Sequence, residues 1–380
     1  MPIPDEARDL FSIPKDVTYL NAAFFTPQLK SRRAAGVEAL NSADAPWTIG
    51  SETFFVPVDR LRGLFARLIG GDADGVAIIP SVSYGVGIAA ANLDVGPGKT
   101  VVVLKDQFPS AIYPWRSALA ENGGEIRTVT LPDQSEPWTD AVLAAIDDTT
   151  AAVSVPNCLW TDGSFLDLAA IGAAARGVGA ALVVDASQSL GAIPFDVGVV
   201  QPDFVFAAGY KWLLGPYALN YLWMSPQHRD GVPLEETWVS RSEANDFTKL
   251  VNYRDEYAPG ARRFDFGERA AFQLMPLAIV AIEQVLEWGV DDVAAATERL
   301  TAAIEKQATI RGLLAAPRHA RGPHLIGLRS PDGLPKGLAG KLAQQKVFVS
   351  VRGDSIRVSP YLYNDQSDVD RLFAALDEAL

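Results

Sequence analysis

The feature that most constrains this chain is a series of short apolar runs between residues 76 and 207. The runs are uniformly apolar and do not alternate with polar residues, which is typical of strands covered on both faces. Stretches such as residues 166–180, which are rich in alanine, separate the runs and predict helices. A repeated order of strand, helix and strand predicts an α/β fold with a mainly parallel sheet and helices on both sides. The expected strands cover residues 76–79, 100–104, 151–155, 181–185 and 203–207.

The rest of the chain follows a different pattern, which predicts a second, smaller domain of α+β type. Residues 225–265 are irregular and polar, and two helices are expected after them, at 270–289 and 292–309. Three strands then follow, and a terminal helix opens on an acidic cap. These expected strands cover residues 324–329, 347–352 and 356–363. The predicted division is an N-terminal arm (1–25), a large domain (26–265) and a small C-terminal domain (266–380).

Composition excludes several classes of protein. A formal net charge of −13 has the wrong sign for binding a phosphate backbone, so no nucleic-acid partner is expected. No run approaches the roughly 20 apolar residues of a membrane span, and the first residues lack the order of a secretory signal. We therefore expect a cytoplasmic protein with no membrane partner. One cysteine, and three histidines without metal-ligand spacing, argue against a zinc enzyme or a serine–histidine triad.

Two expected strands are followed by groups that suit one cofactor. Asp185 ends the strand at 181–185, and Lys211 comes shortly after the strand at 203–207. Ligands of parallel sheets bind at the carboxyl ends of the strands. Pyridoxal phosphate needs a lysine amine for a Schiff base and a carboxylate that keeps its pyridine nitrogen protonated. Taken singly, Lys211 could be a solvated lysine and Asp185 a helix cap. The pair predicts a pyridoxal phosphate site.

The segments around this pair resemble a known family. "VVDASQSLGAIPFD" and "AAGYKWLLGP" are similar to the class V aminotransferases, a group of fold-type-I pyridoxal phosphate enzymes. That group includes cysteine desulfurases, kynureninases and isopenicillin N epimerase-like proteins. Further similar segments lie at residues 19–27, 108–115, 262–268 and 356–364, so the resemblance spans nearly the whole chain.

The resemblance implies roles for residues around the cofactor ring. Lys211 matches the Schiff-base lysine, and Asp185 matches the aspartate paired with the pyridine nitrogen. Gln188 and Asn157 match side chains near the phenolic oxygen. Phe108 occupies the position whose ring stacks on the pyridine.

The phosphate of the cofactor is expected at residues 81–85, between a strand and a helix. Backbone N–H groups at a helix start, with the hydroxyl of Ser83 or Tyr84, suit a dianion. By resemblance, the hydroxyl of Tyr210 also reaches the phosphate.

A second reading of the same region is a dinucleotide site. "GVGIAA" at 85–90 fits the pattern G-x-G-x-x-A after a strand, and Asp106 follows about 20 residues later. Such a site would belong to an NAD(P)-binding dehydrogenase. Nicotinamide chemistry has no use for the pair of Asp185 and Lys211, so this reading stays an alternative only.

The family resemblance also implies substrate contacts. Arg357 matches the arginine that holds the substrate carboxylate through a two-pronged hydrogen bond. Arg352 is the second candidate for this role. Asn21 and Ala22 match an N-terminal loop that closes beside the substrate. Because the substrate carries both an amine and a carboxylate, we expect a small L-amino acid.

Two residues of the segment at 262–268, Arg263 and Glu268, match a region that reaches the partner subunit's site in relatives. This implies a homodimer with shared active sites.

The reaction is less constrained than the cofactor. Desulfurases carry a nucleophilic cysteine on a loop near the two arginines, whereas Cys158 follows the expected strand at 151–155, where a buried packing role fits better. Kynureninases place histidine where Gln188 stands. The sequence favours an aminotransferase, with a cysteine-independent C–S or β-lyase, an epimerase and a kynureninase-like hydrolase as alternatives.

Overall fold

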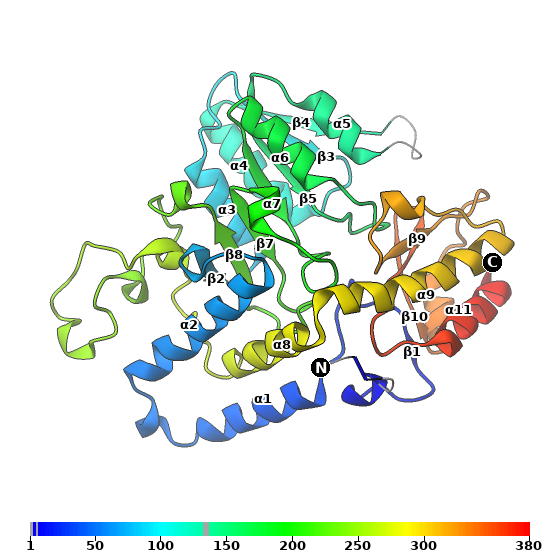
Figure 1. Cartoon of the computed structure of the whole chain (residues 1–380), viewed down its shortest axis with the longest axis horizontal. Coiled ribbons are helices and arrows are strands. Elements are labelled where there is room, and N and C mark those ends of the chain that lie inside the picture. Colours follow the sequence, from blue (N-terminus) through cyan, green and yellow to red (C-terminus); the bar gives the residue numbers. More distant parts are fainter. Residues whose placement is uncertain (1–2, 5–6, 132–136) are drawn as a thin grey trace.

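The computed structural model describes residues 3–4, 7–131 and 137–380, and its largest feature in this part of the chain is a seven-stranded sheet (Figure 1). Strands β4, β3, β5, β6 and β7 run parallel, while β8 is antiparallel to both β7 and β2. In spatial order the strands are β2 (Val76–Ile79), β8 (Asn220–Met224), β7 (Phe204–Ala207), β6 (Ala181–Asp185), β5 (Thr150–Pro156), β3 (Thr100–Leu104) and β4 (Glu125–Val129).

All five strands expected in this region are confirmed, and helices cover the sheet on both faces. The alternating side chains of β3 show this directly, because Val101 and Val103 pack into one core cluster while Val102 and Leu104 pack into another. The uniformly apolar runs thus reflect burial on two sides. The covering helices are α3 (Val82–Asn92), α4 (Tyr113–Asn122), α5 (Trp138–Ala145), α6 (Leu168–Gly177) and α7 (Val197–Val200).

A group of long helices lies at one end of the sheet. Figure 1 shows α1 (Lys30–Ser42), α2 (Ser51–Leu68) and α8 (Met275–Trp288) together, and both α1 and α2 contact α8. The helix α9 (Val290–Ile310) continues from α8 toward the C-terminal elements, so the helices expected at 270–289 and 292–309 are confirmed. The short 3-10 helices are η1 (Ala7–Leu10), η2 (Pro46–Thr48), η3 (Ala73–Gly75), η4 (Pro109–Ala111), η5 (Pro226–His228), η6 (Trp238–Ser240), η7 (Phe247–Lys249), η8 (Gly260–Phe264) and η9 (Arg318–Ala320).

The C-terminal part forms a small antiparallel sheet in the order β11, β12, β9. The N-terminal strand β1 pairs in parallel with β10, so the start of the chain packs against this part. The terminal helix opens as predicted, because the carboxylate of Asp365 accepts hydrogen bonds from two backbone N–H groups. The elements are β1 (Thr18–Tyr19), β9 (Ile326–Leu328), α10 (Leu338–Gln344), β10 (Val347–Phe348), β11 (Ser350–Arg352), β12 (Ser355–Val358) and α11 (Gln366–Ala379).

The strand expected at 356–363 ends earlier, at Val358. Pro360 has no N–H to donate to a ladder. The chain then turns, since the N–H of Asn364 donates to the carbonyl of Tyr361 at 2.9 Å. The apolar residues 361–363 are buried as part of a loop.

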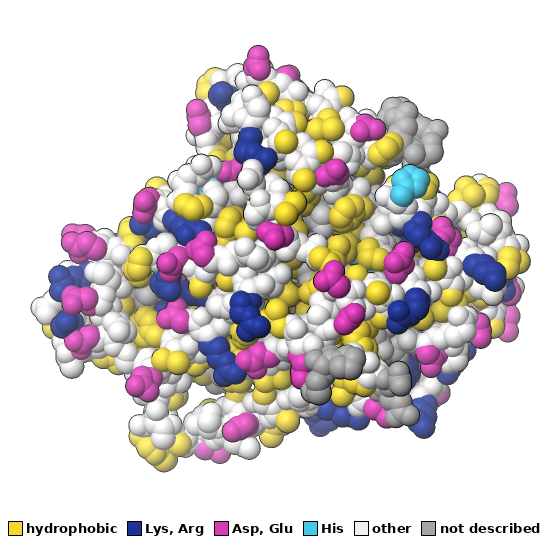
Figure 2. Space-filling model, in the orientation of Figure 1, with side chains coloured by type: hydrophobic (Ala, Val, Ile, Leu, Met, Phe, Trp, Pro, Cys, Tyr) yellow, Lys and Arg dark blue, Asp and Glu magenta, His cyan; other side chains and the backbone are white. Residues whose placement is uncertain are grey.

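The surface carries charges of both signs. On the described residues of the face in Figure 2, lysines and arginines are interspersed with acidic side chains and do not gather into one basic patch. None of the described helices combines the length and apolar character that a membrane crossing requires.

Candidate active site

A cavity of about 300 Å³ lies at the carboxyl ends of β5, β6 and β7. Among the residues around it are Lys211, Asp185, Phe108 and Ser83, which the sequence places far apart. This is the edge of a parallel sheet where ligands are expected.

Lys211 follows β7 on a turn whose backbone is fixed by its surroundings. A Cβ atom on Gly209 would lie 2.2 Å from the carbonyl oxygen of Leu219, so the close approach of these two segments requires glycine. The N–H of Gly209 donates to the side chain of Asn220 at 3.1 Å, and the hydroxyl of Thr26 donates to the carbonyl of Lys211 at 2.7 Å. The turn therefore presents the lysine in one defined position.

The amine of Lys211 is buried, with 9% of the residue exposed, and it forms no ion pair or hydrogen bond with the described residues. Its pKa is lowered to about 8, chiefly by burial and to a smaller extent by the cations of Arg357 and Arg352, while Asp185 acts in the opposite direction. The Nζ atom lies 5.6 Å from the centre of the Phe108 ring. A substantial fraction of this amine is therefore neutral near physiological pH.

Asp185 ends β6, the strand that pairs with β7, and so lies beside the lysine turn. Its Oδ1 accepts a hydrogen bond from the N–H of Ser187 at 2.9 Å. Its Oδ2 forms no hydrogen bond with the described residues. The carboxylate is thus held at one oxygen and has the other left for a ligand.

The start of α3 forms another wall of the cavity. Ser81 caps the helix, since its Oγ accepts from the N–H of Tyr84 at 3.1 Å, and Ser83 Oγ lies 2.9 Å from Ser81 Oγ. Ser83 lines the cavity and Tyr84 does not. The Tyr84 hydroxyl is buried and has no hydrogen-bond partner in the described part of the chain. Burial, followed by the nearby Glu235 and Asp265, raises its pKa to about 12. Free N–H groups and a hydroxyl at this helix start suit an anion.

Phe108 and Tyr210 both line the cavity. Phe108 is 39% exposed, and its ring meets that of Trp160 edge-on at 5.4 Å. The ring of Tyr210 lies 4.8 Å from that of Tyr217, and burial raises the pKa of its hydroxyl. A flat aromatic ligand would meet one accessible face of Phe108.

The two amide residues predicted near the phenolic oxygen are held differently. Gln188 lines the cavity, but its Oε1 accepts from Trp212 Nε1 at 3.0 Å and its Nε2 donates to the carbonyl of Ala23 at 3.0 Å. Asn157 directly follows β5, and its backbone N–H donates to the carbonyl of Asp185 at 3.2 Å. Asn157 is buried and is not among the residues that line the cavity.

Arg357 lies on β12 and is 1% exposed. Its Nη1 donates to the carbonyl of Trp160 at 2.8 Å, and its Nη2 lies 3.5 Å from Asn21 Oδ1 and 3.4 Å from Ser350 Oγ. No described carboxylate forms an ion pair with it. Burial, followed by the cation of Arg352, lowers its pKa to about 9. A buried guanidinium without a counter-anion is a strong attractant for a carboxylate ligand.

The N-terminal loop is attached to this arginine. Asn21 Oδ1 accepts a hydrogen bond from Ser350 Oγ at 2.9 Å, and the N–H of Ala22 donates to the carbonyl of Ser359 at 3.0 Å. Asn21 therefore lies beside Arg357, and Ala22 is hydrogen-bonded to Ser359, two residues further along the chain.

Cys158 is buried, as the sequence predicts, with 1% of the residue exposed, and it is one of the residues around the main cavity. Its thiol lies 3.4 Å from the carbonyl oxygen of Gly163, and burial raises its pKa. A thiol in this state is a poor nucleophile.

Arg263 and Glu268 are not residues of this cavity within one chain. Arg263 donates to Asp230 Oδ1 at 2.9 Å, and its guanidinium lies 4.6 Å from the centre of the Tyr257 ring. Glu268 is exposed.

The sequence reasoning missed several residues of the cavity wall. Trp160 and Gln107 stand in loops after β5 and β3, and Tyr217 follows the lysine turn. They could have been predicted from their position, because each follows a strand that ends at the same edge of the sheet. The other missed residues include Ser110, Ser187 and Asn220.

The alternative prediction of a dinucleotide site is wrong, because its motif does not lie where such a site needs it. Residues 85–90 lie inside α3 and form no turn between strand and helix. A Cβ atom on Gly85 would lie 2.5 Å from the Phe206 ring, so this glycine permits packing of the helix on the sheet.

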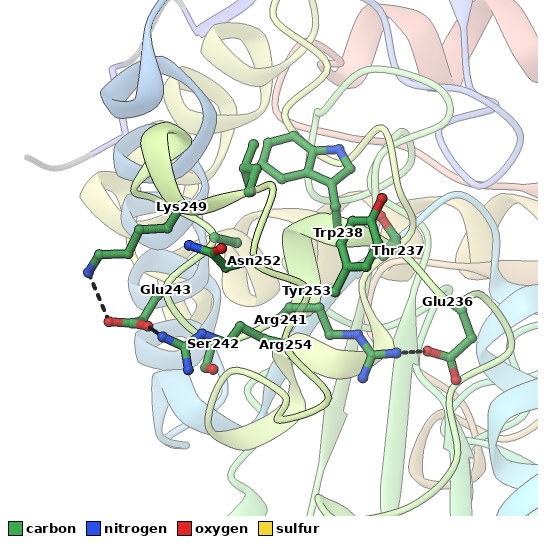
Figure 3. A pocket seen from close by; sticks show the side chains of 12 residues that line it. Glu236, Thr237, Trp238, Arg241, Ser242, Glu243, Lys249, Asn252, Tyr253 and Arg254 are labelled. Atoms are coloured by element: carbon green, nitrogen blue, oxygen red, sulfur yellow. Dashed lines mark hydrogen bonds and ion pairs between the residues drawn. The ribbon is translucent and has the colours of Figure 1, made fainter.

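A separate hollow of about 260 Å³ lies in the segment between β8 and η8 (Figure 3). Its charged side chains are paired with each other. Glu243 pairs with Lys249 at 3.0 Å and with Arg254, and Glu236 pairs with Arg241. None of the predicted site residues lines it.

The main cavity fits pyridoxal phosphate on its own chemistry. It offers a buried amine without an ion pair or hydrogen bond to the described residues, a carboxylate with one oxygen that they leave without a hydrogen bond, an aromatic face and a helix start with hydroxyl groups. Together with the fold, these features define a fold-type-I pyridoxal phosphate enzyme.

Comparison with known proteins identifies the family. The chain belongs to the family described as aminotransferase class-V, whose model matches residues 51–372. The chain is 30% identical, over 319 residues, to the uncharacterized aminotransferase YcbU of Bacillus subtilis, covering 83% of this chain and 81% of the relative. It is 25% identical, over 331 residues, to isopenicillin N epimerase of Streptomyces clavuligerus, covering 84% and 83%.

Solved structures agree on the fold. A mutant of C-DES with glycine linked covalently to its PLP cofactor matches with a TM-score of 0.88, at 19% identity, over 99% of this chain and 100% of that one. A complex of the cystine C-S lyase C-DES with cysteine persulfide matches with a TM-score of 0.87, at 19% identity, over 96% and 98%. The protein is therefore a pyridoxal phosphate-dependent enzyme of the class V family.

Proposed function

We propose that this enzyme is an aminotransferase that acts on a small L-amino acid through Lys211. The observation that carries the proposal is the buried amine of Lys211, whose pKa is lowered to about 8. It lies beside Asp185, whose carboxylate has only one oxygen hydrogen-bonded to the described residues. The guanidinium of Arg357 forms no ion pair with a described residue, and its cation acts on that amine, although Arg357 does not itself line the cavity. It would give the substrate carboxylate a partner.

Pyridoxal phosphate, when bound, supplies an aldehyde that takes up an amine and a ring that accepts electrons from the α-carbon. Lys211 would hold this group in the resting enzyme. Its Nζ, once released and neutral, accepts the proton from the α-carbon and can return it. The lowered pKa leaves part of this amine neutral, and so able to accept a proton, near physiological pH.

Other residues around the cavity would orient the cofactor. Asp185 would keep a proton on the ring nitrogen through its free oxygen. The α3 start, Ser83 and Tyr210 would bind the phosphate, Phe108 would face the ring, and Gln188 and Asn157 would lie toward the phenolic oxygen. We retain Tyr84 among the phosphate candidates, although its hydroxyl lies off the cavity wall.

The substrate carboxylate would bind to Arg357, with Asn21 and Ala22 closing the same side. Two hydrogen bonds from a planar guanidinium fix the rotation of the amino acid, and so the direction of its α C–H bond. Arg352 is the second cation near this position, because it also lowers the pKa of Lys211.

One observation favours transamination, and a second argues against a cysteine desulfurase. The relative at 30% identity is described as an aminotransferase. The buried Cys158, with its raised pKa, does not suit a sulfur-accepting nucleophile. The named relatives also include cysteine desulfurases, kynureninases and an epimerase, so lyase, hydrolase and epimerase chemistry are the outcomes to be tested against it.

We also propose a homodimer in which Arg263 and Glu268 contribute to the partner's site. The support is that both stand away from the cavity of their own chain, and Glu268 is exposed. Mixing Lys211→Ala chains with Arg263→Ala chains would then restore activity in hybrid dimers. Absence of any restoration in hybrids of proven composition would contradict shared sites.

The reaction is tested by giving the loaded enzyme a panel of amino acids with a keto acid acceptor. An aminotransferase yields a keto acid from the substrate and an equal amount of new amino acid from the acceptor. Pyruvate with a released thiol or sulfinate would identify a lyase instead, and inverted stereochemistry an epimerase.

A further inference from the structure

A second cavity, of about 430 Å³, adjoins the site, and Arg352 is the one residue of its wall that enters the function proposed above. Gln107 and Trp160 line both cavities, so the two spaces meet at these residues. The second cavity continues past Trp160 to the β11–β12 turn, at Arg352 and Asp354.

Trp160 is a fixed boundary between the two spaces. Its Nε1 donates to the carbonyl of Asp106 at 2.7 Å, and its own carbonyl accepts from Arg357 at 2.8 Å. The guanidinium of Arg352 lies 5.6 Å from the centre of its ring. A group that passes this ring from the first cavity would arrive at Arg352.

The cations and acidic residues that line the second cavity are equal in number, but they are not all paired. Arg329 pairs with Asp162 at 2.6 Å and with Asp354 at 3.3 Å. Arg352 forms no ion pair with a described residue, and its Nη1 donates only to the carbonyl of Val351 at 2.9 Å. The remaining pair of opposite charges, Lys105 and Asp106, is exposed. Arg352 is therefore the partly buried cation of this wall that lacks a counter-anion.

Gln107 adds an unsatisfied donor at the junction. The residue is 7% exposed, and its Oε1 accepts from the N–H of Leu104 at 3.1 Å, which fixes the orientation of the amide. Its Nε2 is buried and has no hydrogen-bond partner among the residues that the structure describes. An unpaired buried donor is costly unless a ligand satisfies it.

The hairpin sets the spacing between the two arginines. Ser350 pairs with Arg357 and Arg352 pairs with Ser355, so both arginines project from one face as diagonal neighbours. Such neighbours lie about 7–8 Å apart in an antiparallel sheet. That spacing suits two anionic groups on one small molecule.

We propose that the second cavity binds the substrate's side chain and that this side chain ends in a carboxylate, held by Arg352 and Gln107. The inference rests on the aminotransferase function proposed above and names its substrate class, a dicarboxylic amino acid. Arg357 takes the α-carboxylate, and Arg352 takes the distal one.

The test is calorimetric binding of two non-reacting probes to the enzyme loaded with pyridoxal phosphate: glutarate and its monoamide. They have the same length and differ by one charge. We expect glutarate to bind at least about tenfold more tightly, since a hydrogen bond to a charged group contributes roughly 1.5–3 kcal/mol.

Variants test whether Arg352 and Gln107 hold the distal carboxylate. Arg352→Gln should weaken glutarate binding by about 10- to 100-fold and the monoamide by less than about threefold. Gln107→Glu, which keeps the acceptor and replaces the donor, should also weaken glutarate more than the monoamide. Arg67→Gln removes the same charge from an exposed position on α2, outside both cavities, and should change neither.

Equal binding of the two probes by wild type would overturn the inference, as would equal weakening of both by Arg352→Gln. Cofactor loading is measured first by visible absorbance. A chain that does not load contradicts the proposed function and the inference together, whereas a loaded chain without preference for glutarate contradicts the inference alone.

Discussion

Replacing Arg357 by lysine tests how the substrate carboxylate is held. The guanidinium is 1% exposed, donates to the carbonyl of Trp160, and has an Nε without a partner in the described structure. Lysine keeps the positive charge but has no planar fork. The variant therefore separates the charge of this residue from its geometry.

The size of the effect follows from the bonds that are lost. A carboxylate on the guanidinium receives two charge-assisted hydrogen bonds, and the ammonium group replaces them with one. Loss of one such bond costs roughly 1.5–3 kcal/mol, which corresponds to a decrease of about 10- to 150-fold in kcat/KM. Because the second bond orients the α C–H bond, we expect kcat to fall as well as KM to rise.

Steady-state kinetics with the best amino acid of the panel measures this, together with a simple amine that lacks the carboxylate. The kcat/KM for this amine should fall by less than about threefold, because the amine has no carboxylate to bind the guanidinium. Arg321→Lys is the matched control, because Arg321 is also buried but pairs with Glu305 outside the cavity. Unchanged kinetics in Arg357→Lys, with normal cofactor absorbance, would refute the assignment.

Three further predictions concern the cavity. Asp185→Asn should bind the cofactor more weakly and slow α-proton removal by several orders of magnitude, because a neutral amide cannot hold the ring proton; a near-normal deuterium-exchange rate would contradict this. Cys158→Ala should retain turnover within about threefold, since a buried thiol with a raised pKa is a poor nucleophile; a variant that loads cofactor and is inactive would show otherwise. In the chain without cofactor, Lys211→Met should exceed wild type in unfolding free energy by up to about 3 kcal/mol below pH 8. That difference should shrink as the pH rises from about 8 to 10, because the unfolded lysine still binds a proton that the folded one has lost; equal differences in urea unfolding at pH 7 and 9.5 would contradict it.

The sequence predicted the edge strand β2 and four inner strands of the large sheet, but it missed β4 and β8. Strands β3 and β6 are covered on both faces, so their apolar runs are unambiguous. The edge strand β4 has a partly exposed, mixed sequence, EIRTV, which carries no such signal. The run at β8, NYLWM, is fully buried and could have been recognised, but its antiparallel direction is set by the short return from the lysine turn.

The residues of the cavity also divide into those that the sequence predicts and those that it does not. Asp185 and Lys211 could be paired in advance because neighbouring parallel strands end at one edge. The boundary residues Trp160 and Gln107 depend on hydrogen bonds made by loops, to Asp106 and Leu104, which sequence spacing does not specify. The hydrogen bonds of Gln188 to Trp212 and Ala23 likewise arise from tertiary packing.

The most direct test of this account is where pyridoxal phosphate attaches. The chain is loaded with the cofactor, reduced with borohydride and digested, and the modified peptide is identified by mass spectrometry. We predict a single adduct on Lys211, which is lost with all turnover in Lys211→Ala and retained in Lys249→Ala, a change at an exposed lysine. An adduct on another lysine in wild type, or a Lys211→Ala variant that keeps both its adduct and its activity, would contradict the central claim.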